Sequence, residues 1–178
     1  MAEQPAVNSR PARWRPAYVA VGGNLDQPRE RVVEALRRLA AVAETRLELT
    51  SRLYLTQPMG PQDQPQFVNA VAGLLTRLAA RELLDTLLAI EHTMGRDRQE
   101  RWGPRLIDLD LVWISGGVLD EPGLKVPHPG VSERNFVLYP LCDIAPTLVI
   151  PGHGRVADLK ARVGDEGISV LEPDREPA

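Results

Sequence analysis

Cysteine, lysine, aromatic residues and long apolar runs are all scarce in this chain of 178 residues. The single cysteine, Cys142, cannot form a disulfide within the chain, which favours a reducing compartment such as the cytoplasm. No apolar run is long enough to span a membrane, and the polar N-terminus lacks the apolar core of a signal peptide. We therefore expect a cytoplasmic protein with no membrane partner.

Positive charge is also too scarce overall for a general nucleic-acid-binding protein. The formal net charge is −3 and aromatic residues make up 4% of the chain, whereas an RNA-binding sheet stacks bases on exposed aromatic residues of a basic surface. An RNA-binding module is therefore the disfavoured alternative, and we expect no nucleic-acid partner. The arginines are nevertheless concentrated at one place, since Arg96, Arg98, Arg101 and Arg105 lie within ten positions.

Hydrophobic periodicity divides the chain into alternating strands and helices. Strands are predicted at residues 18–21, 46–55, 67–75 and 107–115. Helices are predicted at residues 28–43, 79–94, 132–139 and 156–162. A glycine hairpin turn should lead into a short added strand at 118–119, and an irregularity is expected near Ser51. The order indicates an α+β, ferredoxin-like split β-α-β sandwich, with a largely antiparallel sheet and helices packed on one face.

The length suits one globular domain, and we expect a monomer. Residues 1–16 are polar and carry several arginines and prolines, so they are predicted to form a flexible N-terminal leader. Residues 17–163 should form the domain itself. Residues 164–178 are polar and are predicted to be a frayed C-terminal tail.

A glycine-rich turn follows the first predicted strand. Gly22-Gly23-Asn24 is expected to supply backbone conformations with positive φ and to let a ligand approach the backbone. An ordinary turn between a strand and a helix explains the same residues equally well.

The segment 101–114 combines an arginine-containing loop with an apolar strand that contains two aspartates. Because side chains alternate along a strand, Asp108 and Asp110 should point to the same face. Two carboxylates on one face of a buried strand are costly unless a cation or a polar cavity compensates them. One interpretation is a solvated strand end at which they pair with Arg101 or Arg105. The other, which we favour, is a metal site.

Magnesium suits the second interpretation, because Mg²⁺ prefers a few carboxylate oxygens together with water and substrate phosphates. The nearby arginines carry the forked N–H donors that bind phosphate oxygens. Phosphoryl-type transfer depends mainly on positioning and on neutralisation of charge. These residues therefore predict group transfer that depends on Mg²⁺ and a nucleotide. A nucleotidyltransferase can use the same pair of aspartates and remains the alternative.

The segment 101–112 closely resembles the signature of the 6-hydroxymethyl-7,8-dihydropterin pyrophosphokinase family. Further agreement, in the family's order, comes from Gly22-Gly23-Asn24-Leu25, residues 60–70, Pro127-His128, Arg134 and Phe136. The resemblance covers roughly residues 18–151. It implies a ferredoxin-like enzyme of folate biosynthesis that transfers pyrophosphate from ATP to the hydroxymethyl group of the pterin and releases AMP. It also implies two Mg²⁺ ions as the cofactor.

The resemblance assigns roles to individual residues. The catalytic positions are Arg96, Arg105, Asp108 and Asp110, and the two aspartates are the metal ligands. The ATP contacts are Glu91, Arg96, Arg98, Trp102, Arg105, Leu111, Lys125, His128 and Arg134. The pterin contacts are Thr56, Gln57, Met59, Phe67, Asn69, Trp102, Asp108 and Phe136. Two aromatic rings that sandwich a flat heterocycle, with an amide at its polar edge, give both affinity and orientation.

Several of these positions also have simpler interpretations or depart from the family's pattern. Without the resemblance, Phe67 and Phe136 would be read as core residues and His128 as a residue of a surface turn. Leu88 stands where some relatives carry a polar nucleotide contact, and Gly123 replaces an expected basic residue.

Overall fold

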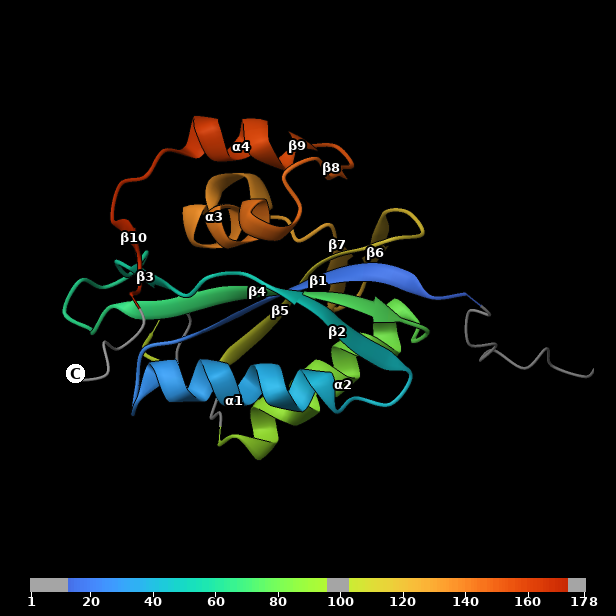
Figure 1. The fold of residues 1–178 in the computed structure, drawn as a ribbon, viewed down its shortest axis with the longest axis horizontal. Helices are drawn as coiled ribbons and strands as arrows, with labels where there is room; N and C mark the ends of the chain where they lie inside the picture. Colours follow the sequence, from blue (N-terminus) through green and yellow to red (C-terminus); the bar gives the residue numbers. More distant parts are fainter. Residues whose placement is uncertain (1–12, 96–102, 173–178) are drawn as a thin grey trace, which may run out of the picture.

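The computed structural model describes residues 13–95 and 103–172, and its centre is a six-stranded sheet (Figure 1). The strands of this sheet are β1 (Arg15–Gly23), β2 (Thr45–Thr50), β3 (Tyr54–Thr56), β4 (Phe67–Thr76), β5 (Asp108–Ile114) and β10 (Ile168–Val170). Their order is β10-β3-β4-β1-β5, and β2 pairs with β4 beside β3. Every neighbouring pair is antiparallel, as the sequence predicted.

Helices cover both faces of the sheet (Figure 1). On one face lie α1 (Pro28–Ala40) and α2 (Ala80–Thr93), and on the other lie α3 (Asn135–Ile144) and α4 (Val156–Val163). The prediction that helices pack on one face was therefore wrong. The reason lies in β4, in which all residues from 68 to 74 are buried. A strand that is apolar on both faces requires cover on both sides.

Helices α1 and α2, which cover one face of the sheet, follow their predicted sequence patterns closely. Helix α1 has Pro28 in its first turn and buries Val32 and Leu39. Helix α2 begins where the Glu82 carboxylate accepts the N–H of Ala79 at 2.9 Å, and it buries Leu83 and Leu87. Both helices lie within three residues of their predicted ends.

The strand predicted at 46–55 is divided into β2 and β3 by an irregularity at Ser51. Ser51 donates its N–H to the carbonyl of Val71 at 3.0 Å, and its hydroxyl oxygen accepts the N–H of Val71 at 2.9 Å. Here a side-chain hydroxyl replaces a backbone carbonyl as the hydrogen-bond acceptor. The regular pairing with β4 is therefore interrupted, and it resumes at Tyr54. The predicted irregularity is confirmed.

The segment after β5 differs from its prediction. Gly116 and Gly117 turn the chain with φ of 121° and 119°, but the next strand, β6 (Leu119–Glu121), pairs with β7 (Leu124–Val126) rather than with β5. The tight turn is supplied by Pro122-Gly123 instead. A short 3₁₀ turn, η1 (Val131–Glu133), then precedes α3, and a second small hairpin joins β8 (Val149–Ile150) to β9 (Gly154–Arg155).

The C-terminal segment also differs from the predicted frayed tail. Strand β10 pairs antiparallel with β3, and the N–H of Leu171 donates to the carbonyl of Leu53 at 2.8 Å. A segment as short as Ile168-Ser169-Val170 carries little pattern, so its structure depends on pairing with another strand. At the other end, Arg15 and Pro16 of the predicted leader belong to β1.

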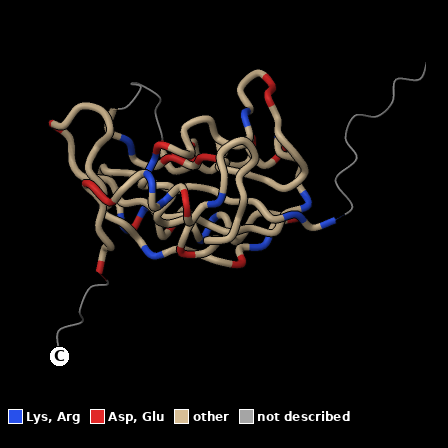
Figure 2. The backbone as a smooth tube through the Cα atoms, turned by 90° about the horizontal axis from the view of Figure 1, so that it is seen from above, with Lys and Arg blue, Asp and Glu red and all other residues tan. Residues whose placement is uncertain are grey.

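The surface of the described chain carries charges of both signs. Acidic and basic positions are interspersed along the backbone (Figure 2). Among the described residues, no helix combines the length and the apolar character needed to cross a membrane.

Candidate active site

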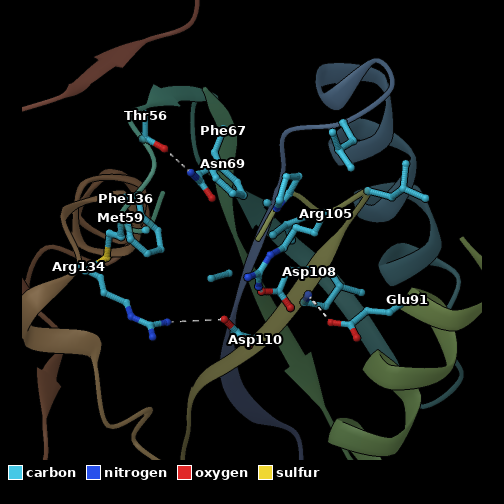
Figure 3. Close-up of a pocket in the computed structure, with 18 of the residues that line it drawn as sticks. Thr56, Met59, Phe67, Asn69, Glu91, Arg105, Asp108, Asp110, Arg134 and Phe136 are labelled. Atoms are coloured by element: carbon cyan, nitrogen blue, oxygen red, sulfur yellow. Dashed lines mark hydrogen bonds and ion pairs between the residues drawn. The ribbon is translucent and has the colours of Figure 1, made fainter. Parts of the chain in front are cut away.

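The register of three adjacent strands brings the candidate residues to one end of the sheet. Gly22 at the end of β1 lies opposite Asn69 of β4 on one side and opposite Asp108 of β5 on the other. A cavity of about 820 Å³ opens there, lined by residues of β1, β4, β5 and α2 and of the loops that follow β3 and β7. The close-up shows side chains from these separate elements pointing into the same space (Figure 3).

Asp108 and Asp110 both line the cavity, while Leu109 between them has its side chain packed in the core. The predicted alternation along the strand is thus confirmed. The side chains of Asp108 and Asp110 are 19% and 37% exposed, so both are accessible to a ligand in the cavity.

Two arginines lie beside these carboxylates. Arg105 Nη1 is 2.5 Å from Asp108 Oδ2, and Arg134 Nη1 is 3.9 Å from Asp110 Oδ2 (Figure 3). The expected pairing with Arg105 is therefore present at Asp108, the first residue of β5, and this pair lines the cavity. Arg101, the other cation considered, lies outside the described residues.

The donor set at the aspartates fits Mg²⁺. In the described part of the chain no group of three or more His, Cys, Asp or Glu side chains forms a ready metal cage. A metal at Asp108 and Asp110 would therefore take its remaining ligands from water and phosphate oxygens, which is the coordination that Mg²⁺ prefers.

The opposite part of the cavity combines aromatic and amide groups. Phe67 of β4 and Phe136 of α3 both line it, with Met59 from the loop after β3 close by (Figure 3). The amide nitrogen of Asn69 donates to the hydroxyl of Thr56 at 2.7 Å, which fixes the orientation of the amide. A flat, polar-edged ligand fits such a setting, because rings supply contact area and the amide supplies direction.

The two glycines at the end of β1 make room for this arrangement. A Cβ on Gly22 would lie 2.2 Å from Asn69 Oδ1, and a Cβ on Gly23 would lie 2.4 Å from the carbonyl oxygen of Leu106. Both glycines belong to the strand, and neither is among the glycines with positive φ in the described chain. The prediction of positive φ was wrong, and close approach of neighbouring groups is what requires glycine here.

His128 is held in one protonation state. Burial, with a smaller contribution from Arg134, lowers the pKa of His128 to about 4, so the ring is neutral at pH 7. Its Nδ1 accepts the N–H of Gly130 at 3.1 Å, which places the proton on Nε2. The backbone N–H of His128 donates to the carbonyl of Val112 at 2.8 Å, so this residue is anchored to β5 and is not part of a free surface turn.

Glu91 of α2 is a buried carboxylate, 2% exposed, at the edge of the cavity. It accepts the backbone N–H of Leu109 at 2.6 Å and so fixes α2 against the strand that carries the aspartates.

A second cavity of about 340 Å³ adjoins the first, since Leu84, Asp110 and His128 line both. Leu111 and Lys125, two of the predicted ATP contacts, line this second cavity, as does Gly123.

The described candidates therefore converge on these two adjoining cavities. The members in the larger cavity are Thr56, Gln57, Met59, Phe67, Asn69, Glu91, Arg105, Asp108, Asp110, His128, Arg134 and Phe136. Three of the predicted site residues lie outside the described residues. They are Arg96, assigned to catalysis and ATP, Arg98, assigned to ATP, and Trp102, assigned to ATP and the pterin.

Sequence reasoning missed an apolar wall. Leu84 of α2 lines the cavity although the helix pattern suggested only core packing. Leu25 also lines it, as does Leu88, which the resemblance had already aligned with a nucleotide contact of some relatives. The available signal was the width of the apolar face of α2. Leu83 and Leu87 already fill the core, and the adjacent Leu84 and Leu88 widen this apolar face beyond the core.

Comparison with known proteins identifies the family. Residues 18–146 match the model of a family described as 7,8-dihydro-6-hydroxymethylpterin-pyrophosphokinase (HPPK). The chain belongs to this HPPK family. The predicted resemblance is thereby confirmed, and with it the enzyme class.

Two named HPPK relatives match over nearly their whole length. A 2-amino-4-hydroxy-6-hydroxymethyldihydropteridine pyrophosphokinase of Pseudomonas aeruginosa is 50% identical over 154 residues, which are 86% of this chain and 95% of the relative. One of Haemophilus influenzae with the same name is 40% identical over 157 residues, 88% of this chain and 98% of the relative.

Solved structures share the fold. The chain matches Plasmodium falciparum HPPK-DHPS, wild type with pteroate, with a TM-score of 0.68 and 12% identity. The match covers 84% of this chain and 44% of that one, so this chain spans less than half of that longer protein. The wild type with SDX-DHP matches with a TM-score of 0.69 and 13% identity, over 86% of this chain and 45% of the other.

Proposed function

We infer that this HPPK-family chain transfers pyrophosphate from ATP to the hydroxymethyl group of 6-hydroxymethyl-7,8-dihydropterin and releases AMP, a step of folate biosynthesis. The observation that carries the inference is the content of one cavity: two carboxylates with arginines on one side, two phenylalanines with an oriented amide on the other. A nucleotide polyphosphate and a flat heterocycle are the two ligands that these groups suit.

At the nucleotide side, Asp108 and Asp110 are the proposed ligands of two Mg²⁺ ions. When bound, these ions neutralise charge on the phosphates and on the group being transferred. Arg105 and Arg134 lie next to the carboxylates and are placed to bind phosphate oxygens through their N–H forks. The remaining proposed ATP contacts are Glu91, Arg96, Arg98, Trp102, Leu111, Lys125 and His128.

His128 acts in this scheme as a neutral hydrogen-bond donor. Its Nδ1 is occupied by Gly130, so only Nε2–H is available to a phosphate oxygen. A neutral donor orients an oxygen without adding to the charge that the arginines and the metal already supply.

At the pterin side, Phe67 and Phe136 are proposed to stack against the ring, with Asn69 at its polar edge. Because the amide nitrogen of Asn69 already donates to Thr56, its carbonyl oxygen is the group left to accept an N–H from the ligand. The other proposed pterin contacts are Gln57, Met59, Trp102 and Asp108.

Catalysis in this arrangement is mainly positioning. The pterin hydroxyl attacks the β-phosphorus, the bond between that phosphorus and the oxygen bridging to the α-phosphate breaks, and AMP leaves. The apolar wall of Leu84 and Leu88 limits water around the transferred group, which protects it from hydrolysis. The protein needs to form no covalent intermediate.

Three finer features complete the proposal. The fold is proposed to be the ferredoxin-like split β-α-β arrangement, and the strand order read without β10 supports this proposal. The chain is proposed to be a monomer, since described residues of this chain line both the carboxylate side and the aromatic side of the cavity. It is proposed to act in a reducing cytoplasm, where a lone cysteine such as Cys142 stays a free thiol. The interspersed charges of Figure 2 support the proposal that no nucleic acid is bound.

The test is a product assay with pure protein, Mg²⁺, ATP and the pterin alcohol. We expect AMP and a pterin diphosphate in equal amounts, with a γ-phosphate label recovered on the pterin. Formation of ADP, or release of labelled pyrophosphate with AMP on the acceptor, would contradict pyrophosphate transfer and would favour a kinase or a nucleotidyltransferase.

A further inference from the structure

Asn24, the residue that follows β1, is buried and fully used in hydrogen bonds. It is 3% exposed. Its backbone N–H donates to the carbonyl of Arg105 at 3.0 Å, and its Oδ1 accepts the N–H of Arg105 at 2.9 Å. Its Nδ2 donates to Gln64 Oε1 at 3.0 Å and to the carbonyl of Pro65 at 2.9 Å. We call this set of contacts the Asn24 bridge.

The Asn24 bridge joins two segments that are far apart in the sequence. Arg105 lies on the nucleotide side, where its guanidinium pairs with Asp108. Gln64 and Pro65 belong to the loop that contributes Met59 and Gly60 to the cavity and leads into β4. One small side chain therefore holds the backbone next to the phosphate-binding arginine and the loop next to the pterin.

The paired bonds to Arg105 have a precise steric requirement. The segment approaches β1 so closely that a Cβ on Gly23 would lie 2.4 Å from the Leu106 carbonyl oxygen. Only an amide at position 24 can accept from Arg105 through its oxygen and donate to the other loop through its nitrogen. An aspartate would keep the acceptor but would place a carboxylate oxygen against the oxygens of Gln64 and Pro65.

We propose that Asn24 is a positioning residue that couples the binding of the nucleotide to the binding of the pterin. A ligand that orders one of the two segments also restrains the other through the Asn24 bridge. The second ligand then loses less conformational entropy when it binds, so each ligand should raise the affinity for the other. By thermodynamic linkage the strengthening must be the same in both directions. This inference rests on the proposed function, since it takes ATP and the pterin as the two ligands.

The test is calorimetric. Pterin binding is measured with and without saturating Mg²⁺ and α,β-methylene ATP, and nucleotide binding is measured with and without the pterin. In the unaltered chain we expect each ligand to raise the affinity for the other by at least about fivefold, the lower range of measured coupling. In Asn24→Ala this coupling factor, the ratio of the affinities for one ligand with and without the other, should fall below about twofold. The affinity for each ligand alone should stay within about threefold of that of the unaltered chain.

A matched control comes from the same loop. Gln62 donates only to carbonyls of its own loop, at Pro58 and Gly60, so Gln62→Ala should keep the full coupling factor. Gln64→Ala removes one bond of the bridge and leaves both bonds to Arg105, so its factor should be intermediate. If Asn24→Ala does not fold, as judged by its melting curve, Gln64→Ala and Gln62→Ala decide the question.

Two results would overturn the proposal. One is a coupling factor close to one in the unaltered chain, which would mean that neither ligand affects the binding of the other. The other is a full factor in Asn24→Ala, or in Gln64→Ala where Asn24→Ala does not fold. Failure of the proposed function looks different, because then one of the two ligands would not bind even in the presence of the other, or the product assay would yield no AMP.

Discussion

Two pairs of arginine and aspartate on this molecule have similar contacts but differ in their surroundings. Asp143 of α3 accepts from the Arg52 guanidinium at 2.7 and 3.1 Å and from the Tyr54 hydroxyl at 2.9 Å, on the face covered by α3 and α4. Asp108 accepts from Arg105 at 2.5 Å, but it and Asp110 line a cavity. We call the first group the Asp143 cluster.

The comparison teaches that an ion pair alone does not distinguish a structural carboxylate from a catalytic one. In the Asp143 cluster, hydrogen bonds from Arg52 and Tyr54 outweigh the effect of burial and lower the pKa of Asp143, as expected for a carboxylate whose partners are protein groups. At Asp108 and Asp110, the surrounding space and the neighbouring aromatic rings indicate a ligand. The four predictions below test this difference, from the largest expected effect to the smallest.

The largest effect should come from Asp110→Ala. Loss of a carboxylate that is proposed to hold the metal should reduce turnover about a thousandfold, comparable to the loss of a preorganised charge-stabilising group. Steady-state AMP production measures the effect, and the matched control is Asp143→Ala, which should keep near-normal turnover. Near-normal turnover in Asp110→Ala would contradict the metal assignment.

The second effect concerns acid stability through His128. Its pKa is about 4 in the folded protein, below the ordinary value of 6.5, so the neutral ring contributes stability above pH 6.5 that is lost as the pH falls toward 4. Allowing for partial exposure, the loss is roughly 2 kcal/mol. Urea unfolding at pH 7 and pH 4.5 measures it, and His128→Gln should show a smaller difference between the two. An equal difference in both proteins would contradict the assignment.

The third effect is a loss of stability without a loss of activity. Asp143→Ala leaves the Tyr54 hydroxyl without its carboxylate partner, which should reduce the free energy of unfolding by about 1.5 kcal/mol. The midpoint of urea unfolding measures this loss. A reduction below about 0.5 kcal/mol would mean that water replaces the carboxylate and that the cluster is dispensable.

The smallest effect should come from Gly22→Ala. The added methyl group would displace the Asn69 carbonyl oxygen, so the KM for the pterin should rise roughly tenfold through misplacement of a positioning group. The KM for ATP should remain within about twofold, since Asn69 lies on the pterin side. Equal changes in both KM values would show that the substitution disturbs the whole site.

Much of the site was predictable because it depends on local patterns. The alternation that places Asp108 and Asp110 on one face needs only the strand itself, and the helices near it follow from apolar spacing. The roles of Phe67, Asn69 and Phe136 came from family resemblance, since isolated phenylalanines are usually core residues. Their convergence on one cavity depends on sheet register, which brings Gly22 between Asn69 and Asp108.

What was missed depends on partners distant in the sequence. The second layer of helices is needed because β4 is buried on both faces. A short continuous apolar run does not reveal this from sequence alone, because a buried helix segment can show the same pattern. The lowered pKa of His128, which keeps the ring neutral, depends on burial and on the charge of Arg134. The role of Asn24 depends on Arg105 and Gln64, which lie 81 and 40 positions away.

Because strand β10 pairs with β3, the far end of the chain supports the part of the cavity that is proposed to bind the pterin. The carbonyl of Gly167 accepts the N–H of Gln57 at 2.8 Å, and Ile168 pairs with Thr56, so this strand braces the start of the loop that carries Met59. The family match ends at residue 146. A shortened chain cut at that boundary would keep the aspartates and the arginines beside them, yet it would lose the brace beneath Thr56, whose hydroxyl orients Asn69. If Thr56 and Asn69 contact the pterin as proposed, substrate selection therefore depends partly on residues that follow the segment matched by the family.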